Sequence, residues 1–232
     1  MRLARALLAA TIAFAGLTTG LRAAELFSEG PGSSDFSIFP GWQRVMTQTS
    51  TQIAPASKVD ATALCPTGTD CKLSQWKAFL KETAKLPRDK QLETVNTWAN
   101  AHPYVEDWAS WGLPDYWETP AEFLARGGDC EDYAIIKYFS LIQLGFQVDE
   151  MRILVVNDIN LGIFHAVLAV HKKDAPTVLL DNQVAQVVPM ALASHYVPIY
   201  SLNEKGWWMA PQTPVATNVD FEAKSVFAAA GR

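Results

Sequence analysis

The sequence is short of cysteine, of positive charge and of long hydrophobic runs, and each shortage excludes a class of protein. Its three cysteines form no CxxC pair and no zinc-finger spacing. Its 19 basic residues are outnumbered by 24 acidic ones, which argues against nucleic acid or an anionic membrane surface as a partner. The apolar run from Ala6 to Leu17 is too short to span a bilayer comfortably. The whole chain has no internal repeats and is 49% hydrophobic, so it can bury one core, which predicts one domain with extensions.

The first residues have the three regions of a secretory signal peptide. Arg2 and Arg5 precede the apolar run, and small residues follow it. We therefore expect residues 1–23 to be a signal peptide and the protein to be exported, with cleavage after either Gly20 or Ala23. An uncleaved anchor is the alternative. Cleavage after Ala23 would remove three basic residues and no acidic one, so the mature chain would be more acidic still.

Export makes the cysteines informative. Cys65 and Cys71 flank a short turn-rich stretch, CPTGTDC, and are predicted to form a disulfide in an oxidising compartment. Cys130 is then left unpaired. An odd cysteine in an exported protein indicates a working thiol, and a buried, inert thiol is the alternative.

Hydrophobic periodicity predicts helices first and strands afterwards. Residues 24–73 are rich in Ser, Thr, Gly and Pro and predict an irregular arm with one short helix near 42–47. Residues 74–210 predict a single domain, and 211–232 a loosely ordered tail. The expected helices cover 74–84 with Ser74 as N-cap, 89–101, a short helix opened by a Thr119–Glu122 capping box, and 131–144. The expected antiparallel strands cover 151–156, 165–170, 177–181, 185–189 and 206–210. This order is typical of an α+β fold.

Two stretches between these elements have unusual compositions. WASWGLPDYWETP is dense in aromatic residues, which either belong to the core or line a groove. RGGDCEDYAII places Cys130 at the start of the helix predicted over 131–144, where unpaired N–H groups and the positive end of the helix dipole favour a thiolate and can receive an oxyanion.

A cysteine nucleophile needs a base and a group that orients the base. His165 opens an apolar strand, and Asp181 ends the next one. If the hairpin between them is symmetric about Lys173, His165 faces Asp181 directly across the ladder on one side of the sheet. A slip of one residue would separate them, and Asn182 would be the nearest substitute. Without such a partner, His165 would be interpreted as a core histidine. The other candidate bases are His102, His171 and His195. A cysteine at a helix start followed by His and Asp on successive strands is a papain-like arrangement.

The carboxylates around Cys130 need an explanation, because negative charge raises a thiol pKa. Asp129, Glu131 and Asp132 offer hard oxygen ligands at a close spacing that suits Ca²⁺. Alternatively, Asp129 caps the helix and the other two occupy its first turn, where acidic residues are favoured anyway.

The stretch DYWETPAEFLARGGDCEDYAIIKYFSL, with His165 and Asp181 downstream, resembles the bacterial transglutaminase-like cysteine peptidases, and in particular their LapG-type periplasmic members. The resemblance extends over about residues 37–210, and its core, GDCEDYA, is specific. It implies a transglutaminase-like core with a buried, nucleophile-bearing helix on an antiparallel sheet. It also implies a triad of Cys130, His165 and Asp181, and bound calcium. The Cys65–Cys71 pair is not part of the family pattern, which indicates a divergent member.

The resemblance further implies a function. LapG-type proteins are periplasmic endopeptidases that cut large surface adhesins near their N-termini and so control biofilm attachment, under an inner-membrane receptor that responds to cyclic di-GMP. Two other functions remain open for the same residues. A transglutaminase-like acyltransferase would share the thioester intermediate, and a periplasmic binding module would use the aromatic groove without catalysis.

Overall fold

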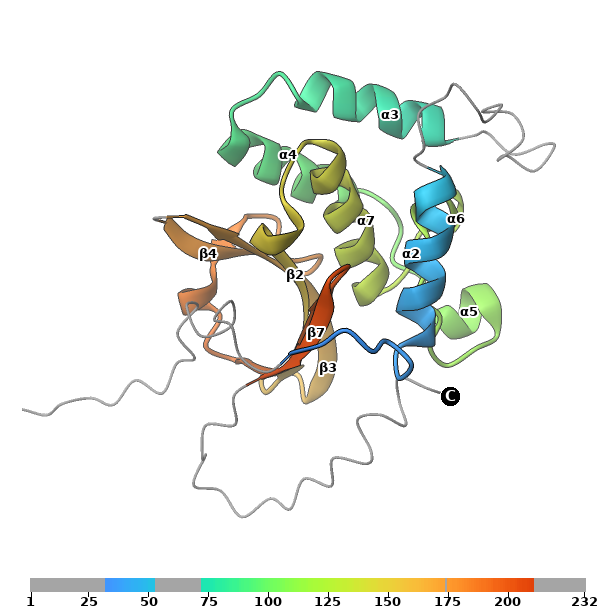
Figure 1. Ribbon diagram of the computed structural model, residues 1–232, viewed down its shortest axis with the longest axis vertical. Coiled ribbons are helices and arrows are strands. Elements are labelled where there is room, and N and C mark those ends of the chain that lie inside the picture. Colours follow the sequence, from blue (N-terminus) through green and yellow to red (C-terminus); the bar gives the residue numbers. More distant parts are fainter. Residues whose placement is uncertain (1–31, 53–71, 174, 211–232) are drawn as a thin grey trace, which may run out of the picture.

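The computed structural model describes residues 32–52, 72–173 and 175–210 of the chain. The expected signal peptide, both cysteines of the expected disulfide and the expected tail lie outside these ranges. Within them, six α-helices pack against a seven-stranded sheet, so the predicted α+β fold is confirmed (Figure 1). None of the helices in the described ranges is long and apolar enough to cross a membrane.

The element bounds are as follows. The helices are α2 (Pro40–Gln52), α3 (Lys72–Thr83), α4 (Arg88–Asn100), α5 (Asp107–Trp111), α6 (Pro120–Arg126) and α7 (Cys130–Gln143), with short 3-10 turns η1 (Val148–Glu150) and η2 (Met190–Leu192). The strands are β1 (Gly32–Ser33), β2 (Met151–Asp158), β3 (Ile163–Lys172), β4 (Ala175–Leu180), β5 (Val188–Pro189), β6 (Tyr196–Asn203) and β7 (Gly206–Met209).

The sheet is antiparallel throughout, in the order β1-β7-β6-β2-β3-β4-β5. The sequence did not predict β6, because proline is rare inside strands and Pro198 lies in this one. Pro198 is tolerated where it sits: it pairs with Val156 at the point where the β2–β6 register shifts. β6 therefore completes the centre of the sheet and brings its first residue, Tyr196, next to β2.

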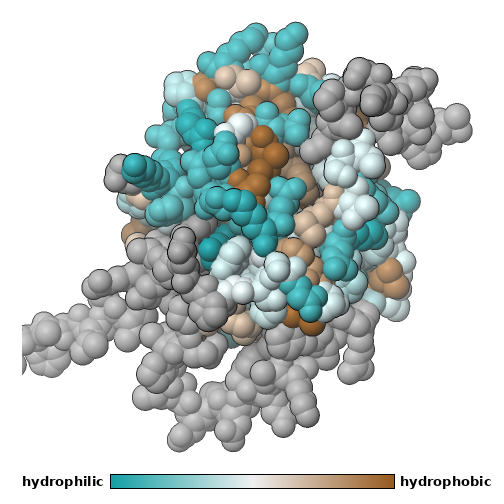
Figure 2. All heavy atoms as spheres, in the orientation of Figure 1, coloured by the Kyte–Doolittle hydropathy of each residue, from teal (hydrophilic) through white to brown (hydrophobic). Residues whose placement is uncertain are grey.

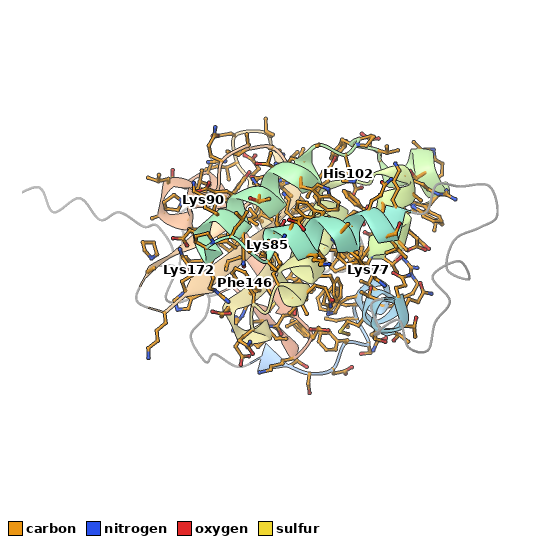
Figure 3. The ribbon with its side chains drawn as sticks, turned by 90° about the horizontal axis from the view of Figure 1, so that it is seen from above. Lys77, Lys85, Lys90, His102, Phe146 and Lys172 are labelled. Atoms are coloured by element: carbon orange, nitrogen blue, oxygen red, sulfur yellow. The ribbon has the colours of Figure 1, made fainter. Side chains whose placement is uncertain are left out.

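The core lies between the helices and one face of this sheet. Leu168 and Val170 of β3 face the helices, and α7 packs directly on β3 and β2. The alternate residues Val167 and Ala169 point to the other face, where Met190 belongs to a smaller cluster. Seen from above, α3 and α4 lie side by side over α7 (Figure 3). The face of the molecule in Figure 2 is largely hydrophilic, with a hydrophobic patch near its centre.

The expected irregular arm is wrong for residues 40–52, which form the three-turn helix α2 in place of the short one near 42–47. Trp42 and Val45 of α2 are fully buried, and the Trp42 indole N–H donates to the Asn203 carbonyl at 3.2 Å. The Trp42 ring also packs edge-on against Tyr138 of α7. Apolar residues at helical spacing thus anchor this segment to the domain despite its polar composition.

Two helix starts test the capping predictions. The α3 helix begins at Lys72, so Ser74 lies inside it and the N-cap prediction is wrong. The Thr119 capping box before α6 is confirmed: the Thr119 N–H donates to a Glu122 carboxylate oxygen at 2.7 Å, and the Glu122 N–H donates to the Thr119 hydroxyl at 3.3 Å.

Two polar residues of α7, Lys137 and Ser140, are buried. Ser140 accepts a hydrogen bond from the Trp76 indole at 2.9 Å. The Lys137 side chain is also fully buried, and its amine has no hydrogen-bond partner among the described residues. Burial lowers the pKa of Lys137 to about 7, while the charge of Asp181 acts in the opposite direction. The centroid of the Tyr133 ring lies 5.7 Å from the amine.

Replacing Lys137 by methionine should therefore raise the stability of the fold. The pKa in the folded state lies below the unfolded value, so between about pH 7 and the unfolded pKa near 10.5 the unfolded chain binds more protons. The destabilisation by Lys137 is thus complete below about pH 7 and is lost as pH rises. The difference in unfolding free energy between Lys137→Met and wild type should shrink by up to about 1.4 kcal/mol per pH unit in this window. Denaturant titrations at two pH values measure it, and a constant difference would contradict the assignment.

Candidate active site and metal centre

Two glycines shape the turn that leads into α7. Gly127 has φ 85°, which favours glycine, and a Cβ there would lie 2.2 Å from the Pro103 carbonyl oxygen. A Cβ on Gly128 would lie 2.4 Å from a carboxylate oxygen of Asp132. Both glycines are thus needed for the close approach of neighbouring groups. They allow the chain to turn sharply and begin α7 at Cys130.

Cys130 is half-buried at the first position of α7. Its sulfur lies 3.2 Å from a carboxylate oxygen of Glu131, so the thiol donates to that carboxylate. The backbone N–H of Ala166 in β3 also bonds to the sulfur. Burial and the charges of Glu131 and Asp129 raise the thiol pKa well above its ordinary value, and the Ala166 N–H opposes them. The site without a cation thus disfavours the thiolate.

The start of α7 reaches the sheet where the edge of β3 is open. The β4 strand ends at Leu180, opposite Leu168, so residues 163–167 have no partner in β4. Ala166 lies on this open segment, and its backbone N–H is the one that meets the Cys130 sulfur. His165 is the preceding residue. The early end of β4 thus places the cysteine beside the histidine's strand.

His165 and Asp181 are joined by a buried contact between Nε2 and Oδ1 at 2.9 Å. Their predicted direct pairing is wrong, because Leu168 pairs with Leu180 and this register sets Asp181 opposite Val167. The two residues are diagonal neighbours. A shift by two residues keeps both side chains on one face, so the contact forms nevertheless. An ionised carboxylate only accepts, so Nε2 carries the proton and Nδ1 is free to face elsewhere.

Asp181 is fixed by further groups that the sequence did not reveal. The N–H of Gln183 donates to Oδ1 at 2.8 Å, and the Tyr196 hydroxyl donates to Oδ2 at 2.5 Å. The Asn100 amide of α4 donates to the backbone carbonyl of Asp181 at 2.8 Å. Burial alone would raise the pKa of Asp181, but the bonds from His165 and Tyr196 hold it below its usual value. The carboxylate is therefore ionised.

Cys130 and His165 line the same cavity, which has a volume of about 250 Å³. One wall comes from the acidic start of α7 and the loop before α6, and the other from β2, β3 and β6. The remaining lining residues are Pro114, Asp115, Trp117, Asp129, Glu131, Val155, Phe164, Ala166, Ile199 and Tyr200. A nucleophile and a base thus open on a space of the size of a few side chains.

The sequence left open whether the aromatic residues of the loop belong to the core or line a groove, and different residues do each. Trp117 is buried and also lines the cavity, whereas Trp108 is 68% exposed. Trp111 donates its indole N–H to Glu118 at 2.6 Å, and Trp117 donates to Asp115 at 3.1 Å. Neither description fits the whole loop. The indoles hold acidic side chains against the start of α7.

These acidic side chains enlarge the predicted metal centre. Asp107 is the first residue of α5 and Asp115 lies in the aromatic loop, and each can place an oxygen within 4.8 Å of one from Glu131. Asp107 also forms such a group with Asp129 and Asp132. No periodic pattern connects the loop to α7. The only signal in the sequence is that acidic residues recur between the aromatic ones.

The cluster fits a cation. Burial raises the pKa of Asp107 to about 7, with the charge of Asp129 adding to the effect, and burial raises that of Glu118 to about 7. Burial also raises the pKa values of Asp115, Asp129 and Glu131. Asp129 Oδ1 and Glu118 Oε2 are buried without a hydrogen-bond donor in the described part of the chain. Unpaired, crowded carboxylate oxygens are the ligands that Ca²⁺ prefers.

Asp132 differs from the other acidic residues. One of its oxygens accepts from the Glu118 N–H at 2.7 Å and the other from the Asp129 N–H at 3.1 Å. Its carboxylate thus ties the loop to α7, and truncation to alanine would orphan two N–H groups at a cost of about 1–3 kcal/mol each.

The sequence profile of a family described as bacterial transglutaminase-like cysteine proteinases (BTLCP) matches residues 59–214, well over half of the chain. The chain belongs to this family. It is therefore a cysteine proteinase, as the resemblance of its GDCEDYA stretch implies. A search of the curated proteins found no significant match.

Solved structures place this proteinase near LapG of Legionella pneumophila. One LapG structure is 29% identical, covers 72% of this chain and 87% of its own, and superposes with a TM-score of 0.54. A calcium-bound LapG structure is 26% identical, covers 76% of this chain and 93% of its own, with a TM-score of 0.55. An EGTA-treated form is 28% identical over 73% of this chain and 86% of its own, also at 0.55. This proteinase is thus of the LapG kind.

Proposed function

We propose that this proteinase is a calcium-dependent endopeptidase with Cys130 as nucleophile, His165 as base and Asp181 as the residue that orients the base. The proposal rests on one observation above all: Cys130 and His165 open on one cavity, where the 2.9 Å contact to Asp181 fixes the histidine. The carboxylates beside the cysteine support the cation requirement.

The proposed reaction follows from the directions of these groups. With Nε2 bonded to Asp181, Nδ1 of His165 receives the Cys130 proton. The thiolate attacks the scissile carbonyl carbon, and N–H groups in the first turn of α7 stabilise the oxyanion. The imidazolium then protonates the leaving amine, which leaves an acyl thioester on Cys130. A water molecule, deprotonated by His165, hydrolyses the thioester and restores the thiol.

Calcium would be held by the crowded carboxylates beside Cys130, among which Asp129 Oδ1 has no other partner in the described residues. Asp107, Asp115, Asp129 and Glu131 are the proposed ligands, with backbone carbonyls and waters completing the shell. Asp132, expected as a ligand from the sequence, is proposed here to position Asp129 through its hydrogen bonds. A bound cation supplies positive charge that offsets the carboxylates and lowers the thiol pKa. As a calcium ligand, the Glu131 carboxylate would no longer hold the Cys130 proton through the hydrogen bond between them.

The proposed substrate is a large cell-surface adhesin, cut near its N-terminus, and the proposed location is the periplasm. The signal-peptide pattern of residues 1–23 supports export, and the likeness to LapG supports the substrate class. An inner-membrane cyclic di-GMP receptor is the proposed regulator on the same grounds.

Cleavage of the cell envelope tests this function. Envelope proteins of the source bacterium are incubated with wild-type protein or with Cys130→Ala, with calcium, and new N-termini are labelled and identified by mass spectrometry. We expect wild type alone to create one dominant new N-terminus, near the start of a large exported protein. New isopeptide or amine adducts in place of new N-termini would indicate acyl transfer, and identical profiles would reject the protease function.

The base can be tested separately. His165→Ala should lower the cleavage rate nearly as much as loss of the cysteine, because residues of a triad act as a unit. Asp181→Asn should cost less, since it disturbs the orientation of the imidazole without removing it. His171→Ala is the matched control, because His171 lies on β3 but beyond the cavity. Rates near wild type for both His165→Ala and Asp181→Asn would send the search to the remaining histidines.

A further inference from the structure

The Asp181 carboxylate has a second side-chain partner besides His165. Its Oδ1 is shared by His165 and the Gln183 N–H, and its Oδ2 accepts from the Tyr196 hydroxyl at 2.5 Å. Asp181 is 1% exposed, so water contributes little to holding it. Within the described residues, Tyr196 is the one side chain recorded as bonding to Oδ2. The orientation of the carboxylate plane therefore depends on this hydroxyl.

Tyr196 contacts the base as well as the acid. It is the first residue of β6 and pairs with Asp158 of β2, on the side of β2 away from β3. Its side chain extends over the face of the sheet that carries His165 and reaches Asp181. The centroids of the Tyr196 and His165 rings lie 5.6 Å apart. One side chain thus bonds to the carboxylate and packs beside the imidazole. Residues from β6 and β3 and the residue that follows β4 meet at this contact.

We propose that Tyr196 is a positioning residue that fixes the Asp181 carboxylate and, through it, the orientation of His165 toward Cys130. This inference rests on the proposed function of the triad. It adds a hydroxyl that touches neither the substrate nor the thiol.

The protonation states agree with this geometry. Burial, together with the hydrogen bond to Asp181, raises the pKa of Tyr196, so the hydroxyl keeps its proton and donates it to the carboxylate. Charge-assisted hydrogen bonds of this kind are short and directional. Without the hydroxyl, Oδ2 would lose its donor, and the carboxylate could rotate while the Gln183 N–H still held Oδ1. The imidazole would then lose its fixed orientation without losing its partner.

The first test compares two matched variants in the full chain with calcium present. The probe is iodoacetamide, and the readout is the alkylation rate of the peptide that contains Cys130. Tyr196→Phe should lower this rate about tenfold, the size expected for one charge-assisted hydrogen bond. Tyr138→Phe removes another buried hydroxyl that donates to a carboxylate, that of Glu204 at 3.2 Å, and should leave the rate unchanged.

The second test separates positioning from simple destabilisation. In an Asp181→Asn background, Tyr196→Phe should cost less than about twofold, because its effect passes through the carboxylate. Spectra of protein labelled at its four histidines supply an independent signature. The His165 Nε2–H signal should be slowly exchanging in wild type and Tyr138→Phe, and shifted or broadened in Tyr196→Phe.

Two results would overturn the inference. One is an unchanged rate and spectrum for Tyr196→Phe. The other is the same loss in the wild-type background and in the Asp181→Asn background, which would mean that Tyr196 acts independently of the carboxylate. If wild-type Cys130 reacts no faster than it does in His165→Ala, the proposed function fails instead, and the two failures are thus distinguished.

Discussion

Cys130→Ala should lower the cleavage rate by roughly four to six orders of magnitude while leaving the fold intact. The acyl thioester cannot form without the sulfur, and no other described cysteine can replace it. The side chain is small and half-buried, so its loss should cost little packing. It also removes a thiol whose pKa is raised by burial and by Glu131, which is no loss to stability.

Initial rates on the cleaved substrate and thermal unfolding of each variant provide the measurement. Cys130→Ser is the matched control, because it keeps the shape and a hydroxyl that hardly ionises at neutral pH, and it should be equally inactive. Substantial activity in Cys130→Ala, with an unchanged cleavage site, would reject the nucleophile.

Removal of calcium should have the next largest effect. Excess EGTA should lower activity at least about tenfold, and added Ca²⁺ should restore it better than Mg²⁺, which requires a tighter octahedral shell and gives up water reluctantly. The physical cause is the cluster itself. Asp107 and Asp129 repel each other, and Glu131 and Asp129 repel the thiolate, when no cation lies between them. Asp129→Asn should reproduce the chelated state, since Asp129 Oδ1 has no other partner among the described residues.

Glu204→Gln is the matched control for this prediction. Glu204 is also a carboxyl whose pKa is raised by burial, but it bonds to Tyr138 and lies outside the cluster. The Glu204→Gln variant should keep both the calcium dependence and the cleavage rate of the wild type. Full activity in excess EGTA, together with a wild-type rate for Asp129→Asn, would reject the calcium site. The acidic residues beside Cys130 would then be ordinary residues of a helix start.

Local patterns in the sequence predicted much of the fold. The period of 131–144 predicted α7 to within a residue at each end, and the predicted hairpin placed His165 and Asp181 on one face of the sheet. The register was wrong by two residues, because the turn between β3 and β4 is not symmetric about Lys173. His165 and Asp181 still lie on one face of the sheet, because a shift of two residues does not change the face. Side-chain parity is thus a safer prediction than direct pairing.

The missing parts of the site come from segments without a period. Asp107 begins the short helix α5 and Asp115 lies in the aromatic loop, and only the tertiary fold brings them to Glu131. Tyr196 belongs to β6, which the sequence did not predict because Pro198 lies in this strand. Its hydrogen bond to Asp181 could therefore not be predicted either. Lys137 lies in the helix predicted over 131–144, and its local sequence did not reveal that this charged side chain is fully buried. Long-range packing decides all of these positions.

The central claim is that a cation and His165 together make Cys130 reactive, and one measurement addresses it directly. The alkylation rate of Cys130 by iodoacetamide is followed at neutral pH in wild type with calcium, in wild type with EGTA and in His165→Ala with calcium. The account predicts fast labelling in the first sample alone, with a rate at least about tenfold lower in the other two, because thiolate is the reactive form. Equal rates in all three samples would contradict it.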